Sequence, residues 1–470
     1  MQVTIEELSD KVLLKIFRYF LYTSPRHWIR LVHICHKWRR VVFEAQRPLP
    51  LRLFCTYGTP VLKTLDCWPA LPIVVEYGGS PALGPPTPED EDNIVAALKR
   101  SERVTSITLT VTGSLLTKLS TLEGPFSKLE DLVLLSRDNV RRYLPSTFLW
   151  GPRLRRLHST SIAFPAILQL LSSSSNLVDL LLHDVLNISH FSLETLAKSL
   201  SGMSQLRSLS LHLPPAFTYR APPPPSKECF VLPALTHLDF RGMSCYLEIL
   251  VAIIDARRLE DIEITLLDNP VFRHLNLREF IDRMETHKSP SRTHILFSED
   301  AISISLMRPA APTCLRLQLV CKPLSMQLYF MDRICVDIST FLLNVRGLRI
   351  SVTRPEWAEW QKRHYLERWV EILGSFSRVT RLRLDAKHLT NVMHTLLALE
   401  RRPNIVLPAL HKIYIPQAMH HATLTKSVMS LITSRHLSGH AITVEYEQSG
   451  EICVTGPYAA VPSSTPANSF

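Results

Sequence analysis

The sequence predicts an α/β protein in which a small all-helical module at the N-terminus precedes an irregular array of strand-plus-helix repeats. Apolar residues recur at helical spacing before residue 45, and beyond residue 100 the phrase L-x-x-L-x-L keeps returning. The 470 residues also exceed the roughly 250–300 that one hydrophobic core accommodates. The chain therefore forms several domains or an elongated repeat.

Residues 8–42 are predicted to form two or three helices, with a break between the first helix and the rest. The first helix carries its apolar residues on one face, at Leu8, Val12, Leu13, Ile16, Phe17 and Phe20. Ser9 suits the N-cap position of this helix, and Pro25 disfavours helical geometry in the residue before it. The second helix resumes with Trp28, Leu31, Val32, Cys35, Trp38 and Val42 at spacings of three and four. A module this short usually needs a disulfide, a metal or a partner for stability, and only a partner protein remains plausible here.

These two stretches resemble the F-box family, whose pattern is approximately L-P-x-E-[VIL]-L-x-x-I-[FL] followed by V-C-[RK]-x-W-[RK]. Residues 8–17 read LSDKVLLKIF, and residues 32–39 read VHICHKWR. Ser9 replaces the family proline, which is preorganised for the first turn. Lys11 replaces an acid, and its charge opposes the helix dipole. Both departures predict an adaptor affinity below that of the family.

The resemblance implies that residues 1–45 dock a Skp-type adaptor, and through it a cullin, without catalysing a reaction. The candidate contact or core residues carried over from the family pattern are Leu8, Val12, Leu13, Ile16, Phe17, Val32, Cys35 and Trp38. The sequence does not separate contact residues from core residues. The alternative interpretation is a plain helical hairpin that belongs to the main domain.

Residues 46–88 are predicted to be a connector, because proline recurs along them and residues 78–88 form a Pro/Gly-rich stretch. An acidic run follows at residues 89–92. Carboxylates favour a helix N-terminus, so this run predicts the start of a helix over residues 93–100.

The repeated phrase predicts a leucine-rich-repeat-like solenoid over residues 89–456, with one short strand per unit and helical returns on the other face. Its copies start at Val104, Leu129, Leu154, Leu177, Leu206, Leu235 and Leu259, and later at Val345, Val379 and Leu410. The first seven are 23 to 29 residues apart, within the range of leucine-rich repeats. Residues 214–225 form a predicted polyproline loop, and residues 457–470 a predicted disordered tail.

Between residues 259 and 345 the phrase is lost. Residues 295–297, 302–306 and 315–319 are nevertheless apolar or alternating, which predicts strands. Helical returns are predicted at residues 193–200, 245–254 and 355–373. The wider pattern of the chain also resembles fungal F-box proteins with degenerate leucine-rich repeats.

No motif of the common enzyme classes occurs, so we predict a protein that is not an enzyme, with no catalytic residues, no cofactor and no metal ligands. Gly79 and Gly84 have the Walker spacing, but Pro85 and Pro86 stand where the phosphate-binding lysine and the hydroxyl residue are required. His33, Cys35 and His36 lack a second ligand pair and are interpreted as helix residues. Catalysis would need a site assembled from residues distant in sequence.

The net charge of +11 raises the alternative of a nucleic-acid-binding solenoid that uses the basic cluster at residues 141–156. The basic residues occur as isolated pairs, which favours a solvated surface, so nucleic acid is not the expected partner. The nine cysteines form no C-x-x-C pair, and no apolar run has the length of a membrane span. A cytoplasmic or nuclear protein with no membrane partner is predicted.

The leading hypothesis is a substrate-recognition subunit of a Skp/cullin/F-box-type ubiquitin ligase, whose solenoid binds a protein substrate. A repeat scaffold that acts outside ubiquitination is the other alternative.

Overall fold

The computed structural model describes residues 8–23, 28–44, 49–68, 71–78, 84–119, 121–122, 125–136, 151–162, 164–184, 192–213, 229–268, 277–284, 290–308, 313–353, 363–384, 396–397, 406–416 and 422–447. The chain is a mixed α/β protein with extensive parallel strand pairing. It divides into two compact units. The first holds residues 1–240 and 249–257, and the second holds residues 241–248 and 258–470.

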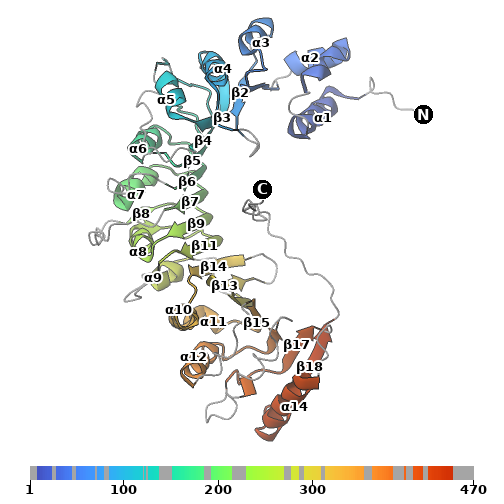
Figure 1. The fold of residues 1–470 in the computed structure, drawn as a ribbon, viewed down its shortest axis with the longest axis vertical. Coiled ribbons are helices and arrows are strands. Elements are labelled where there is room, and N and C mark those ends of the chain that lie inside the picture. Colours follow the sequence, from blue (N-terminus) through green and yellow to red (C-terminus); the bar gives the residue numbers. More distant parts are fainter. Residues whose placement is uncertain are drawn as a thin grey trace, which may run out of the picture. The chain divides into compact units, whose positions relative to one another are not determined.

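The N-terminal stretch contains α1 (Asp10–Thr23), the 3-10 helix η2 (Trp28–His33) and α2 (His36–Glu44) (Figure 1). The prediction of an all-helical module is therefore wrong in detail. A 3-10 segment and a non-helical residue at Cys35 precede α2, and strand β1 follows it. Apolar spacings of three and four suit both helix types, so the pattern did not distinguish them. Ser9 occupies the position before α1, where its carbonyl oxygen accepts hydrogen bonds from the amides of Val12 and Leu13.

The predicted connector holds regular structure: β1 (Leu51–Phe54), α3 (Val61–Cys67) and β2 (Ile73–Tyr77). β1 pairs with β2, and β2 pairs with β3 (Val104–Val111), both in parallel. Helix α4 spans Pro88–Leu98, so it starts five residues earlier than predicted. Thr87 and Asp90 form a capping box at its N-terminus, in which each side chain bonds the other's backbone amide.

The strands of the first unit follow the order β1-β2-β3-β4-β5-β6-β7-β9. After β3 come β4 (Asp131–Ser136), β5 (Arg156–Thr160), β6 (Asp179–His183), β7 (Ser208–His212) and β9 (His237–Gly242). The pairs from β1 to β7 are parallel. Helices α4, α5 (Gly113–Leu119), α6 (Phe164–Ser172) and α7 (Leu193–Ser201) lie along one side of the strands (Figure 1). A separate parallel pair joins β8 (Phe230–Val231) to β10 (Ile254–Asp255), and α8 spans Ser244–Ile253.

The repeated phrase supplies the core, as predicted. All its apolar residues from Val104 to Ile264 are buried, most of them completely. Each phrase begins at or just before a strand, whose residues alternate between buried and more accessible positions. The apolar residues therefore share the face that the helices cover. We call the opposite face of the first unit's strands the open face.

The second unit has the strand order β11-β14-β13-β12-β15-β16-β17-β18. Its strands are β11 (Asp261–Leu266), β12 (Arg292–Phe297), β13 (Ala301–Met307), β14 (Thr313–Val320), β15 (Gly347–Val352), β16 (Arg381–Leu384), β17 (Lys412–Pro416) and β18 (Thr443–Glu447). Its helices are α9 (Leu277–Asp282), α10 (Leu324–Asp337), α11 (Ser339–Leu342), α12 (Arg363–Gly374) and α14 (Ala422–Leu437). Figure 1 shows α10, α11 and α12 on one side of β13 and β15.

The three strands predicted between residues 259 and 345 are present, but they do not form one parallel strand per unit. β13 is antiparallel to both β12 and β14. β12 and β13 are joined by a tight turn in which the Ser298 amide donates to the Ala301 carbonyl oxygen at 2.8 Å. So short a connection joins antiparallel strands, whereas a parallel crossover needs a dozen or more residues.

Several predictions concern residues outside the described part of the chain. These are the polyproline loop at 214–225, the tail at 457–470, residues 448–456 of the predicted solenoid, and Arg141 and Arg142 of the basic cluster. Among the predicted helical returns, 193–200 and 245–254 correspond to α7 and α8. The described part of 355–373 lies in α12.

Candidate functional site

The structure divides the eight residues of the F-box-like pattern into buried and exposed groups. Leu13, Phe17, Val32 and Trp38 are buried. Val12 and Ile16 are exposed, with 42% and 45% of their surface accessible, and Leu8 and Cys35 are half-buried. The first group forms the interior of the helical stretch, and the second leaves apolar surface available to a partner.

The buried group is held together by aromatic packing and by side-chain hydrogen bonds to backbone carbonyl oxygens. The Phe17 and Trp38 rings lie 4.8 Å apart at a tilt of 56°. Lys37 Nζ donates to the Leu8 carbonyl oxygen at 2.8 Å, which ties α2 to the start of α1. Arg39 Nε donates to the Val32 carbonyl oxygen at 3.1 Å. The helices therefore pack against each other through a defined, if small, core.

The exposed group forms a stripe on α1, which we call the α1 stripe and define as Val12, Ile16 and Tyr19. Spacings of four and three place these residues on one helix face. Tyr19 is 71% exposed, and Ile34, just before α2, is 57% exposed. Tyr19 is not part of the predicted set. Its position one turn after Ile16 is the signal that could have identified it.

A second arrangement of functional groups lies on the open face and was not predicted. His183 ends β6, His212 ends β7, and Asp239 lies in β9. His183 and His212 are register partners on adjacent parallel strands, and their rings stack at 3.7 Å with an interplanar angle of 4°. His212 Nε2 lies 2.8 Å from Asp239 Oδ2. We call these three residues the histidine cluster.

Ser210 and His158 extend the histidine cluster. Ser210 Oγ donates to Asp239 Oδ2 at 2.7 Å and lies 3.4 Å from His183 Nε2. The His158 ring meets the His183 ring edge-on at 5.6 Å. Side chains from four strands thus converge at one place.

The environment of the histidine cluster favours a charged carboxylate next to imidazole. Burial raises the pKa of Asp239, but hydrogen bonds from His212 and Ser210 outweigh it, so this pKa lies below its usual value. Burial lowers the pKa of His158, which favours its neutral form. The arrangement offers imidazole nitrogens and a carboxylate oxygen that are accessible from the open face.

The signal for the histidine cluster is present in the sequence. Two consecutive repeats end in Leu-x-Leu-His, at residues 180–183 and 209–212. Residues at the same position in two consecutive repeats become neighbours when the strands of those repeats pair in parallel. A search for ligands close in sequence does not detect such a site, because His212 and Asp239 are 27 residues apart.

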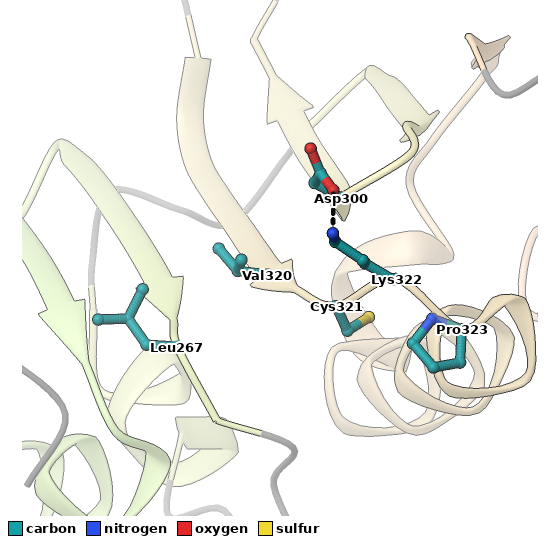
Figure 2. Close-up of a pocket in the computed structure, with 6 residues that line it drawn as sticks. All are labelled: Leu267, Asp300, Val320, Cys321, Lys322 and Pro323. Carbon is teal, nitrogen blue, oxygen red and sulfur yellow. Dashed lines mark ion pairs between the residues drawn. The ribbon is translucent and has the colours of Figure 1, made fainter.

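A depression in the described part of the second unit has a volume of about 600 Å³ and is drawn in Figure 2. It is lined by Leu267, Asp300, Val320, Cys321, Lys322 and Pro323. Lys322 Nζ and Asp300 Oδ1 form an ion pair at 3.8 Å, and both side chains are largely exposed. Cys321 is the one thiol among these lining residues and is buried, whereas Asp300 and Lys322 are largely exposed and pair with each other.

The basic cluster at residues 141–156 is described only from residue 151 onward. Within that part, Arg156 forms two hydrogen bonds to the Asp131 carboxylate on the neighbouring strand, at 2.6 and 3.0 Å. This pairing reduces the charge that Arg156 would offer to a phosphate.

Comparison of the chain with protein-family models finds no match, and comparison with curated proteins finds none either. Within the described helices, none combines the length and the hydropathy that crossing a bilayer requires.

Proposed function

We propose that the protein is a non-catalytic substrate-recognition subunit of a Skp/cullin/F-box-type ubiquitin ligase. Residues 8–44 would dock the Skp-type adaptor, and the leucine-rich-repeat-like strands and helices would hold a protein substrate. The F-box-like sequence pattern is the starting point of this proposal, and the placement of the pattern's residues supports it.

The observation that carries the proposal is the α1 stripe above a buried interior. A docking module needs apolar residues that are accessible before the partner binds, together with a separate set that maintains its fold. Val12 and Ile16 meet the first requirement, and Leu13 and Phe17 meet the second. Had all four been buried, the pattern would reflect internal packing alone.

The open face supports the second half of the proposal. Successive strands present side chains of varied chemistry there, such as Asp131, His158, His212 and Asp239. A row of polar groups contributed by different repeats suits recognition of a protein surface, because the contacts are distributed along the array.

The test is the affinity of the purified chain for a Skp-type adaptor, with Ile16→Asp as the variant. Fully burying an aliphatic side chain contributes about 1.5–3 kcal/mol, and Ile16 is 45% exposed, so loss of that further burial should weaken binding by roughly 3- to 10-fold. The matched control is Leu62→Asp. Leu62 lies on α3 and is 62% exposed, so the same change is made on another helix of the first unit.

Variants of Leu13 or Trp38 would not serve, because these side chains are buried and their loss would unfold the helices. Lys11→Glu provides a gain-of-function arm, since it restores the acid of the family pattern and removes a cation from the first turn. Tighter adaptor binding is expected. If the wild-type chain binds no Skp-type adaptor, or if Ile16→Asp and Leu62→Asp bind equally well, the proposal is wrong.

A further inference from the structure

We propose that His183, His212 and Asp239 form a binding site for a divalent transition-metal ion of the zinc type on the open face. This inference rests on the geometry of the histidine cluster and does not depend on the proposed adaptor role. No metal site was predicted from the sequence.

The distances suit metal binding. One ligand atom from each of the three residues lies within 4.8 Å of the other two. Metal–ligand bonds of roughly 2.0–2.2 Å place two ligand atoms about 3.3 Å apart in a tetrahedral site. His212 Nε2 and Asp239 Oδ2, at 2.8 Å, are already slightly closer than this. Binding one ion therefore requires side-chain rotations of His183 and His212 and a slight separation of His212 Nε2 from Asp239 Oδ2, all within ligand atoms that already lie within 4.8 Å of one another.

The backbone places the two imidazoles next to each other. His183 and His212 are paired in register between β6 and β7, so both side chains leave the sheet on the same face. In the stacked arrangement, with ring centroids 3.7 Å apart and planes 4° apart, the in-plane nitrogen lone pairs run parallel, so the rings must tilt for both to reach one ion.

A neighbouring hydroxyl orients the carboxylate. Ser210 Oγ donates to Asp239 Oδ2, as groups around metal sites commonly do for ligating carboxylates. The side chains of His212 and Asp239 are 24% and 41% exposed. An ion can therefore enter from solvent, and coordination positions remain for water or for a side chain of a partner.

The donor set selects the class of ion. Two imidazole nitrogens and one carboxylate oxygen suit Zn²⁺ and other first-row transition ions, whereas Ca²⁺ and Mg²⁺ prefer oxygen ligands. The alternative is that the His212–Asp239 contact is only an ion pair between neighbouring strands. This alternative predicts no metal affinity at the histidine cluster.

The test is calorimetric titration of the full chain with Zn²⁺ after removal of metals by chelation. Asp239→Asn keeps the shape of the side chain, and His212→Ala removes one imidazole. Changes in the surroundings of a metal site cost roughly 10- to 100-fold in affinity. Loss of a direct ligand should therefore cost at least about 100-fold, and Ser210→Ala about 10-fold.

The matched control is His237→Ala. His237 lies on β9, two residues before Asp239, and is exposed. The His237→Ala variant should bind Zn²⁺ with the same affinity as the wild type. Mg²⁺ should bind only weakly to the wild type and to this variant. Circular dichroism checks that each variant is folded, and Zn²⁺ should raise the thermal midpoint of the wild type but not of Asp239→Asn. Absence of Zn²⁺ binding by the wild type at micromolar concentration would overturn the inference, as would equal binding by wild type, His212→Ala and Asp239→Asn.

Discussion

Asp90→Ala is expected to destabilise the first unit far more than removal of its acidic neighbour Asp92. The sequence places both in one acidic run, yet the structure separates them. Asp90 is 5% exposed, whereas the Asp92 side chain is 74% exposed and forms an ion pair with Lys118. Asp90 Oδ2 accepts hydrogen bonds from the Thr87 amide at 2.9 Å and the Tyr77 hydroxyl at 3.3 Å. Its Oδ1 accepts the amide of Tyr57.

The magnitude follows from the donors that would lose their acceptor. Each buried donor left without a partner costs about 1–3 kcal/mol, and the amides of Tyr57 and Thr87 lose their acceptor, whereas the Tyr77 hydroxyl still has the Gly84 carbonyl oxygen at 3.4 Å. Both amide contacts are only part-buried, so water replaces part of the loss. The expected cost of Asp90→Ala is therefore about 2–4 kcal/mol. Thr87→Ala removes only the N-cap acceptor and should cost about 1 kcal/mol.

Urea unfolding followed by circular dichroism measures these differences, and Asp92→Ala serves as the matched control. The expected order of destabilisation is Asp90→Ala, then Thr87→Ala, then Asp92→Ala, with the last close to wild type. A cost below about 1 kcal/mol for Asp90→Ala, or equal costs for Asp90→Ala and Asp92→Ala, would refute the reasoning.

Two further predictions concern ionisation. Burial and the neighbouring Glu371 carboxylate raise the pKa of Asp332 despite its 2.7 Å contact with Arg368. The folded state thus binds this proton more tightly than the unfolded state, so its contribution to stability falls as pH rises above the ordinary pKa of 3.8. Asp332→Asn should flatten this trend in thermal midpoints measured between about pH 4 and pH 7; an unchanged slope would contradict the assignment. Burial also raises the pKa of the Cys55 thiol to about 12, whereas Cys67 is exposed. Iodoacetamide at pH of about 8 should label Cys67 first, as read by peptide mass spectrometry, and equal labelling of native Cys55 would show that it is not buried.

The parallel strands could be predicted because the repeated phrase encodes one-sided burial directly. An apolar residue at every second position defines a buried face whatever the rest of the repeat contains. Alternation does not encode strand direction, however. The runs around Ile295, Ile304 and Leu317 were identified as strands, but the antiparallel pairing of the first two depends on the short turn after Phe297.

Contact residues and interior residues of the F-box-like pattern could not be separated from the sequence. Val12 and Leu13 are adjacent and similar in chemistry, yet one is exposed and the other fully buried. Which of them faces inward depends on where Trp38 packs, and that is a tertiary property. The histidine cluster escaped prediction for a related reason, because its members meet only when the strands of three repeats are in register.

The reversed strand β13 has a consequence for how the second unit folds. In the first unit, strand neighbours are close in sequence, as Asp131 and Arg156 at 25 residues apart illustrate. Across β11 and β14 the separation is 53 residues for Glu263 and Arg316, and across β12 and β15 it is 57 for His294 and Ser351. When each repeat contacts only its sequence neighbours, folding can start in one repeat and propagate to the next. In the second unit, β15 cannot add to the sheet until β12, β13 and β14 have paired. This pairing closes longer loops, which slows folding. Pairing of the strands in residues 290–320 is thus expected to be a slow folding step during synthesis. At that stage the parallel strands before these residues have been made, and those after them have not.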